Sequence, residues 1–249
     1  MNRQAQSAVL FLLGASLLHA GTTDLYLRYV KQGLRPLVLA AGAVLIAAAV
    51  ATVWYEWKRA RRQKGHEAEG EGHEAEAGHT HHEPRVAWLL VLPLLALILV
   101  APPALGSYSA TRTGTALQEP LAYPALPAAD PLPLSVVDYA GRAVYDHGRT
   151  LQGRRVQLTG FLALDRDGTP YLVRMALNCC AADAQPVKVA LTGQVPPVLQ
   201  PDTWLQVTGS YTARRAKDPV NGGPIPYIEV TEAKPAPAPK DPYDESWNS

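Results

Sequence analysis

Residues 34–57, LRPLVLAAGAVLIAAAVATVWYEW, decide the fold class of this chain. The run carries one early charge at Arg35 and reaches no other until Glu56. A helix of about 20 apolar residues crosses a hydrocarbon core of about 30 Å. We therefore expect an integral membrane protein with this segment as one of its spans.

Two further hydrophobic runs flank this span. Residues 86–106 carry no charge, and membrane helices tolerate their prolines because neighbouring groups can satisfy the freed carbonyls. A shorter run begins near residue 7, where a charged start and a short apolar centre also fit a cleaved signal peptide. We favour an uncleaved helix that forms a hairpin with residues 34–57. Residues 1–106 then form a transmembrane region with spans at about 7–30, 34–57 and 86–106.

Basic residues predict the orientation of these spans. The densest basic cluster follows residue 57 and consists of Lys58, Arg59, Arg61, Arg62 and Lys64. Because Lys and Arg near span ends are retained in the cytoplasm, loop 58–85 is expected to be cytoplasmic. The chain after residue 106 is then extracytoplasmic, and the protein is a multi-pass protein of the cell (inner or plasma) membrane.

The chain beyond the last span changes character twice. Residues 107–133 are rich in proline and predict a stiff stalk. Residues 134–145 favour a short helix that begins near Ser135 or Asp138. The tail at 233–249 starts with alternating Pro and Ala and is expected to be flexible.

A period of two in the apolar residues predicts strands between these segments. The expected strands are 155–164, 170–177, 187–192, 203–211 and 226–231. Five short strands in about 80 residues favour a small all-β domain, an OB-like five-stranded barrel within residues 134–232. A β-sandwich fragment is the alternative.

The only two cysteines are adjacent, in the string NCCAADA at residues 178–184. They follow the second expected strand, where side chains can be presented to a ligand. Thiolates of Cys179 and Cys180 with the carboxylate of Asp183 suit a soft metal or metalloid. Three ligands fall short of a closed zinc site, so a partner or a residue such as His147 would complete it.

Two other interpretations of the cysteine pair stay open. Small apolar cysteines can serve as core residues on opposite faces of a strand. An extracytoplasmic pair could also form a disulfide, although adjacent Cα atoms about 3.8 Å apart force a strained ring.

The expected cytoplasmic loop is polar and repetitive, with GHEAE at 65–69 recurring at 72–76. Its histidines are His66, His73, His79, His81 and His82. Imidazoles interspersed with glutamates suit divalent zinc, nickel or cobalt, and a loop without a core would buffer or deliver the ion. The alternative is a solvated low-complexity spacer.

Several function classes lack their motifs. The sequence has no phosphate-binding glycine loop, no Gly-x-Ser-x-Gly elbow and no His-Glu-x-x-His helix. The charges of the outer domain are mixed, so its OB-like pattern does not argue for nucleic acid. We expect neither an enzyme nor a nucleic-acid-binding protein.

Four strings carry a resemblance to a known family: Gly160-Phe161, Arg174, CCAADA at residues 179–184, and Val207-Thr208-Gly209. Together with the N-terminal spans they resemble an uncharacterised bacterial membrane-protein family, described as the small subunit of a predicted two-component permease. The resemblance implies a larger multi-spanning permease as partner and points to zinc or related metal homeostasis. It covers most of the chain but not the histidine-rich loop.

The leading hypothesis is an accessory subunit of a membrane transporter. Cys179, Cys180 and Asp183 would present a thiophilic ion outside, and the histidine loop would handle a divalent metal such as zinc inside. Three spans are too few for a conduction path, so a permease partner is expected. The alternatives are a membrane-tethered carrier or chaperone for metal or haem, with His147 as candidate ligand, and a thiol-redox protein.

Overall fold

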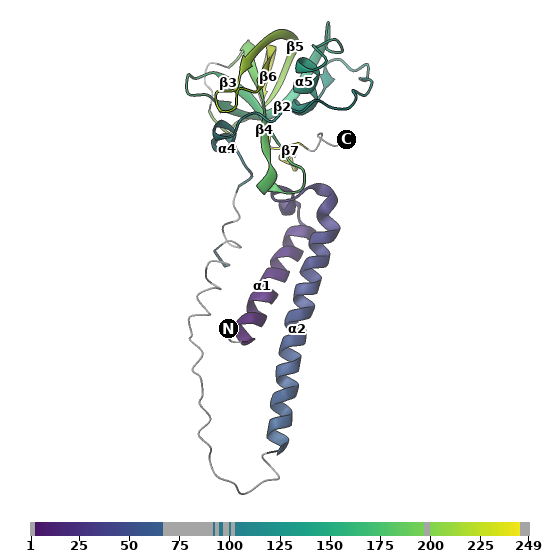
Figure 1. Ribbon diagram of the computed structural model, residues 1–249, viewed down its shortest axis with the longest axis vertical. Coiled ribbons are helices and arrows are strands. Elements are labelled where there is room, and N and C mark those ends of the chain that lie inside the picture. Colours follow the sequence, from purple (N-terminus) through teal and green to yellow (C-terminus); the bar gives the residue numbers. More distant parts are fainter. Residues whose placement is uncertain are drawn as a thin grey trace. The chain divides into compact units, whose positions relative to one another are not determined.

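The computed structural model describes residues 3–66, 103–196 and 200–244, together with Leu92, Leu95, Ala96 and Val100. The chain divides into two compact units. The first comprises Met1–Tyr26 and Gly33–Pro102, and the second comprises Leu27–Gln32 and Pro103–Ser249. Figure 1 labels the elements of both units.

Two long helices make up the first unit, α1 (Arg3–Thr22) and α2 (Arg35–His66). They lie side by side (Figure 1), and Gly14 faces Gly42 where they meet. A side-chain carbon placed at Gly14 would lie 2.8 Å from the Gly42 carbonyl oxygen, and one at Gly42 would lie 3.0 Å from that of Gly14. Small residues let the two backbones approach closely, as they do between membrane helices.

The first helix is shorter than the predicted span 7–30, because α1 ends at Thr22. The hydroxyls of Thr22 and Thr23 donate to the carbonyls of Leu18 and His19, at 2.8 and 2.9 Å. Such bonds from side chain to backbone compete with continuation of the helix. The chain goes on as two short 3-10 turns, η1 (Asp24–Arg28) and η2 (Gln32–Leu34).

Both helices are long and apolar enough to cross a membrane, over Ala5–Thr22 (18 residues) and Gln32–Arg59 (28 residues). Large apolar side chains along α2 are more than half exposed: Leu37, Val44, Val50, Val53, Trp54, Tyr55 and Trp57. Exposed apolar surface of this extent marks contact with a membrane or a protein. Most of the third expected span, 86–106, lies outside the described residues.

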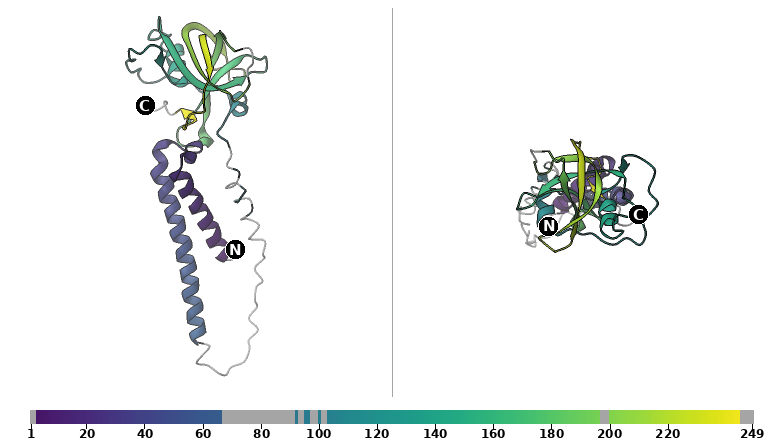
Figure 2. Two further views of the ribbon diagram at one scale, coloured as in Figure 1. Left: turned by 180° about the vertical axis from the view of Figure 1, so that it is seen from behind. Right: turned by 90° about the horizontal axis from the view of Figure 1, so that it is seen from above.

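The second unit contains a five-stranded β-barrel. Its strands are β2 (Arg155–Leu164), β3 (Pro170–Ala176), β4 (Gln185–Gly193), β5 (Trp204–Lys217) and β6 (Pro224–Pro235). They follow the order β2-β5-β6-β4-β3, and a further pairing of β3 with β2 closes the barrel (Figure 2). Neighbours are antiparallel except β4 and β6, which are parallel. All five expected strands are present, and the predicted barrel is confirmed.

A helix completes the barrel core. The predicted helix is α5 (Val136–Val144), and of the two starts considered, Ser135 and Asp138, it is Ser135 that caps it: its hydroxyl accepts the Asp138 N–H at 2.9 Å. Its buried face packs on the apolar strand residues, and the Tyr139 hydroxyl donates to the Tyr227 carbonyl at 2.7 Å. The hydroxyl is thus satisfied while the ring contributes to the core.

The predicted stalk at 107–133 is wrong. Ser107–Arg112 form helix α4, and Leu132–Pro133 form strand β1, which pairs in parallel with β2. Leu117, before the first proline of the segment, and Leu126, between Pro124 and Pro127, pack against the barrel core. Proline favours extended backbone, but burial of the apolar side chains between prolines decides where that backbone lies.

The predicted flexible tail at 233–249 is also wrong for its described part. Strand β6 continues through Pro235, and β7 (Tyr243–Asp244) pairs in parallel with Met175 and Ala176 of β3. Tyr243 is 3% exposed. Backbone pairing and one buried aromatic side chain hold the segment on the barrel, and residues 245–249 lie outside the described part of the chain.

One buried ion pair ties the barrel together. Lys188 Nζ lies 2.7 Å from Asp218 Oδ2, and both side chains are almost fully buried. The ammonium also donates to the Thr113 carbonyl at 3.0 Å, and the carboxylate accepts the N–H groups of Thr115 and Val220 at 2.8 Å each. These bonds offset the cost of burying the charges.

Candidate functional site

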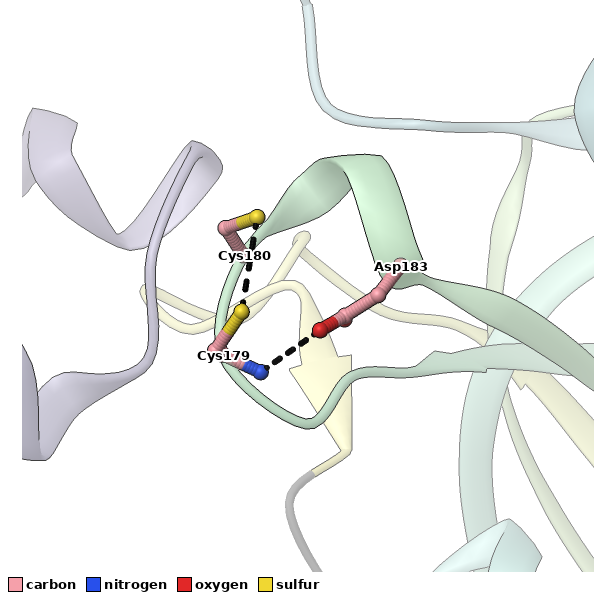
Figure 3. A group of neighbouring side chains, drawn as sticks. All are labelled: Cys179, Cys180 and Asp183. Atoms are coloured by element: carbon pink, nitrogen blue, oxygen red, sulfur yellow. Dashed lines mark hydrogen bonds between the residues drawn. The ribbon is translucent and has the colours of Figure 1, made fainter.

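The loop between β3 and β4 carries both cysteines and is called here the cysteine loop, residues 178–184. The chain leaves β3, turns through η4 (Ala181–Asp183) and enters β4. The Asp183 carboxylate closes the loop, because its two oxygens accept the N–H groups of Asn178 (3.0 Å) and Cys179 (2.9 Å). Figure 3 shows the second of these bonds. The local sequence therefore folds the acid back onto the cysteines.

The potential ligand atoms lie close together. The two sulfurs are 3.6 Å apart as free thiols (Figure 3), and one ligand atom from each of Cys179, Cys180 and Asp183 lies within 4.8 Å of the others. Cys179 is exposed, while Cys180 and Asp183 are half-buried. Among the described residues, this is the one group of three or more His, Cys, Asp or Glu side chains that could share a metal ion.

Hydrogen bonds within the loop shift the ionisation of two of these groups. A hydrogen bond to the Asp183 carboxylate and the neighbouring Cys180 raise the pKa of the Cys179 thiol to about 12. Burial opposes ionisation of Asp183, but hydrogen bonds from the Cys179 thiol and from backbone N–H groups outweigh it and lower its pKa. At neutral pH an ionised carboxylate thus lies beside a protonated thiol.

This donor set fits a thiophilic divalent ion. Thiolate sulfur and carboxylate oxygen are ligands that zinc accepts, and a bound metal removes the proton from a coordinating thiol. Three protein ligands leave one tetrahedral position open. An ion held by these three ligands would therefore still have room for a ligand from another molecule.

The segment Leu27–Gln32 lies beside the cysteine loop within the second unit. The Lys31 N–H donates to the Cys179 carbonyl at 3.1 Å, and the Ala181 N–H donates to the Tyr29 carbonyl at 2.7 Å. Nothing in the local sequence of either segment signals this pairing, because backbone groups supply both bonds.

Arg174 holds the C-terminal strand rather than the cysteines. Its Nη2 donates to the carbonyls of Asp241 (3.2 Å) and Tyr243 (2.6 Å), and its guanidinium lies 5.1 Å from the ring centre of Trp204. Burial lowers the pKa of Arg174, against the opposing effect of the Asp244 and Asp241 charges. The structure therefore gives this candidate residue a positioning role.

His147 does not join the cysteine group. It follows α5 with a positive φ of 52°, and its Nδ1 lies 3.2 Å from Nη2 of Arg215. Because a guanidinium only donates, Nδ1 accepts and the ring proton is assigned to Nε2. In this arrangement the imidazole has no lone pair left for a metal or a haem iron.

The histidine loop falls almost entirely outside the described residues. His66 is the last residue of α2. His73, His79, His81 and His82 lie beyond it, in the part that the structure does not describe.

Two family models match the chain in succession. The DUF1980 N-terminal domain matches residues 6–116, and the DUF1980 C-terminal domain matches residues 138–244. The chain carries both domains of the DUF1980 family. This family is uncharacterised and assigns no activity or substrate.

The domain matches fit the elements seen in the structure. The DUF1980 N-terminal domain covers α1, α2 and α4, and the DUF1980 C-terminal domain runs from α5 to β7 and contains the cysteine loop. Its end at residue 244 agrees with β7 belonging to the barrel unit. No curated protein and no solved structure matches the chain.

Proposed function

We propose that this chain is a non-enzymatic accessory subunit of a membrane permease, which binds a thiophilic divalent ion, zinc foremost, and passes it to a multi-spanning partner. One observation carries the proposal. The cysteine loop already gathers ligand atoms of Cys179, Cys180 and Asp183 within 4.8 Å of one another.

The sulfur spacing supports a tetrahedral ion. Two sulfurs bound to one zinc at about 2.3 Å each lie about 3.8 Å apart, and the Sγ atoms of Cys179 and Cys180 are 3.6 Å apart. Binding then needs little rearrangement, which lowers the ordering cost. A disulfide needs about 2.0 Å between sulfurs, so the two cysteines are free thiols here and both sulfurs are available as ligands.

The open coordination position supports transfer rather than storage. Cys179 is exposed, so a thiolate, imidazole or carboxylate of a partner can reach an ion held there. A partner ligand that enters before the loop ligands leave would move the ion without releasing it to solvent. This is the expected chemistry of a subunit that feeds a permease.

The two apolar helices would anchor the barrel at the cell membrane, with the barrel on the extracytoplasmic side. Lys58 lies 5.3 Å from the ring centre of Trp54, and the Arg61 guanidinium lies 3.6 Å from that of Trp57. Aromatic and basic residues together are typical of a membrane interface, and the basic excess predicts its cytoplasmic side. The adjoining histidine loop would exchange divalent metal there.

The strand order supports an OB-type barrel. Counted along the chain, the first barrel strand pairs with the second and fourth, and the fifth lies between the third and fourth. This Greek-key closure of five strands agrees with the OB description, in which connecting loops contribute to ligand binding. The cysteine loop is the connection between the second and third barrel strands.

Cobalt titration of the full chain in mild detergent tests the ion site. Thiolate-to-cobalt charge-transfer absorption requires cysteine, and the chain has only two, so the histidines cannot produce it. We expect this absorption to saturate, to disappear when zinc is added, and to be absent in Cys179→Ser/Cys180→Ser. His147→Ala should retain it. Absence of the absorption in the wild type, or its loss in His147→Ala, would overturn the site assignment.

Co-purification tests the subunit assignment. After native expression and mild detergent extraction, the chain should be recovered with a multi-spanning membrane protein. Recovery as a lone monomer would contradict the proposal.

A further inference from the structure

The cysteine loop and the segment Leu27–Gln32 form one backbone junction in the second unit. Val30 and Cys180 are paired in an antiparallel bridge, so the residue opposite Val30 is itself a candidate metal ligand. The flanking bonds join Lys31 N–H to the Cys179 carbonyl and the Ala181 N–H to the Tyr29 carbonyl. The backbone groups that the cysteine loop contributes to this junction all belong to Cys179, Cys180 or the adjacent Ala181.

A second anchor holds the same segment. The hydroxyl of buried Tyr243 on β7 donates to the Arg28 carbonyl at 3.0 Å and accepts the Leu105 N–H at 3.3 Å. Arg174 holds Tyr243 through its carbonyl at 2.6 Å. The segment is thus fixed at Arg28 from one side and at residues 29–31 by the cysteine loop.

The chain leads directly from this junction into the long helices. Tyr29 follows the end of η1 by one residue, and α2 begins at Arg35, four residues after Lys31. A change in how residues 29–31 are held therefore acts on the connection between α1 and α2.

We propose that metal occupancy of the cysteine loop and docking of Leu27–Gln32 are thermodynamically coupled, so that the connection between α1 and α2 senses the loaded state. The inference rests on the proposed ion site. An ion that fixes both sulfurs also fixes the Cys179 carbonyl and the Ala181 N–H, which strengthens the docking bonds. Linkage is reciprocal: the factor by which the bound ion strengthens docking is also the factor by which docking strengthens ion binding, so loss of docking must weaken ion binding.

Ala181→Pro tests this coupling with little local disturbance. Ala181 is the first residue of η4, where proline is tolerated, and Cys180 before it is extended at φ −154° and ψ 167°, as a residue preceding proline prefers. The substitution removes the N–H that donates to Tyr29. Ala181→Ser keeps the N–H and is the matched control.

We expect Ala181→Pro to weaken cobalt binding about three- to tenfold, the range of one net hydrogen bond, with Ala181→Ser close to the wild type. Tyr243→Phe should weaken it in the same direction, whereas Tyr171→Phe, which loses a bond to Asp165 on the β2–β3 connection, should not.

Amide hydrogen exchange of the full chain supplies a readout independent of affinity. Zinc should slow exchange in peptides that contain Lys31, with no such slowing in Cys179→Ser/Cys180→Ser and no change in peptides from β2. Unchanged or faster exchange at Lys31, or unaltered affinity in Ala181→Pro, would overturn the coupling while leaving the ion site intact. If the wild type shows no cobalt–thiolate absorption, the ion site itself fails.

Discussion

The barrel unit contains two clusters of polar side chains, the Lys188–Asp218 ion pair and the cysteine loop. They differ in burial and in how many hydrogen-bond or ligand positions are already occupied. Lys188 and Asp218 are buried, and three backbone groups satisfy them further. Cys179 is exposed, and the cysteine loop gathers three potential ligand atoms from Cys179, Cys180 and Asp183, the site proposed above to hold an ion. A closed buried network stabilises one fold, whereas an open set of ligands near the surface can exchange a bound ion.

Breaking the closed network should have the largest effect on stability. Lys188→Met leaves the Asp218 carboxylate buried without its cation, which costs about 3–5 kcal/mol in the free energy of unfolding. Denaturant titration of the full chain in mild detergent measures this. The double variant Lys188→Met/Asp218→Leu should recover most of the loss, because it replaces the pair by apolar side chains. If Lys188→Met lowers the free energy of unfolding by less than about 1 kcal/mol, the buried ion pair is not the stabilising network that the comparison assumes.

Acid should weaken the same network. Burial alone raises the pKa of Asp218, but hydrogen bonds from Lys188, Val220 and Thr115 outweigh burial and lower it. A carboxyl with a lowered folded pKa contributes its full stability above its unfolded pKa of about 3.9, and loses that contribution as pH falls through the lower folded value. Unfolding midpoints measured from pH 6 down to acid should fall more steeply for the wild type than for Lys188→Met/Asp218→Leu. Parallel curves would exclude this linkage.

Asp183 combines a structural role, like that of the Lys188–Asp218 pair, with a proposed ligand role, like that of Cys179. Its carboxylate closes the cysteine loop by hydrogen bonds and is also a proposed ligand. An asparagine can accept only one of the two N–H groups that the carboxylate accepts. Asp183→Asn should therefore cost about 1–2 kcal/mol in stability and also weaken cobalt binding. Asp167→Asn, at an exposed carboxylate that accepts the Thr169 N–H, is the control. Equal effects of the two substitutions on cobalt binding would remove Asp183 from the ligand set.

Local patterns in the sequence predict those features whose causes are local. The strand at 155–164 is predicted with both ends correct, because alternation and flanking turn residues define it. Cys179, Cys180 and Asp183 are also predicted as a group, since all three lie within five consecutive residues of one tight loop. Capping residues predict the start of α5 to within three positions, at Ser135 or Asp138, and Ser135 is the cap.

Features that depend on distant partners are missed. The Lys188–Asp218 pair joins residues far apart in the sequence, and Lys188 lies within an otherwise apolar run of β4, where its sequence context names no partner. The pairing of residues 29–31 with the cysteine loop uses backbone groups that every sequence offers. Segment 107–133 is misjudged because its composition predicts extended backbone but does not reveal the surface on which that backbone packs.

Cys179→Ser should have the smallest effect on stability and so gives the sharpest contrast with Lys188→Met. The side chain is exposed and serine can still donate a hydrogen bond to Asp183, so the free energy of unfolding should change by no more than about 0.5 kcal/mol. Cobalt affinity should nevertheless fall by at least tenfold, because a neutral hydroxyl replaces a thiolate ligand; the charge-transfer band that remains from Cys180 measures the change. Denaturation and cobalt titration on the same preparation test both halves. A stability loss comparable to that of Lys188→Met would show that Cys179 belongs to the folding network, and unchanged affinity would show that its sulfur is no ligand.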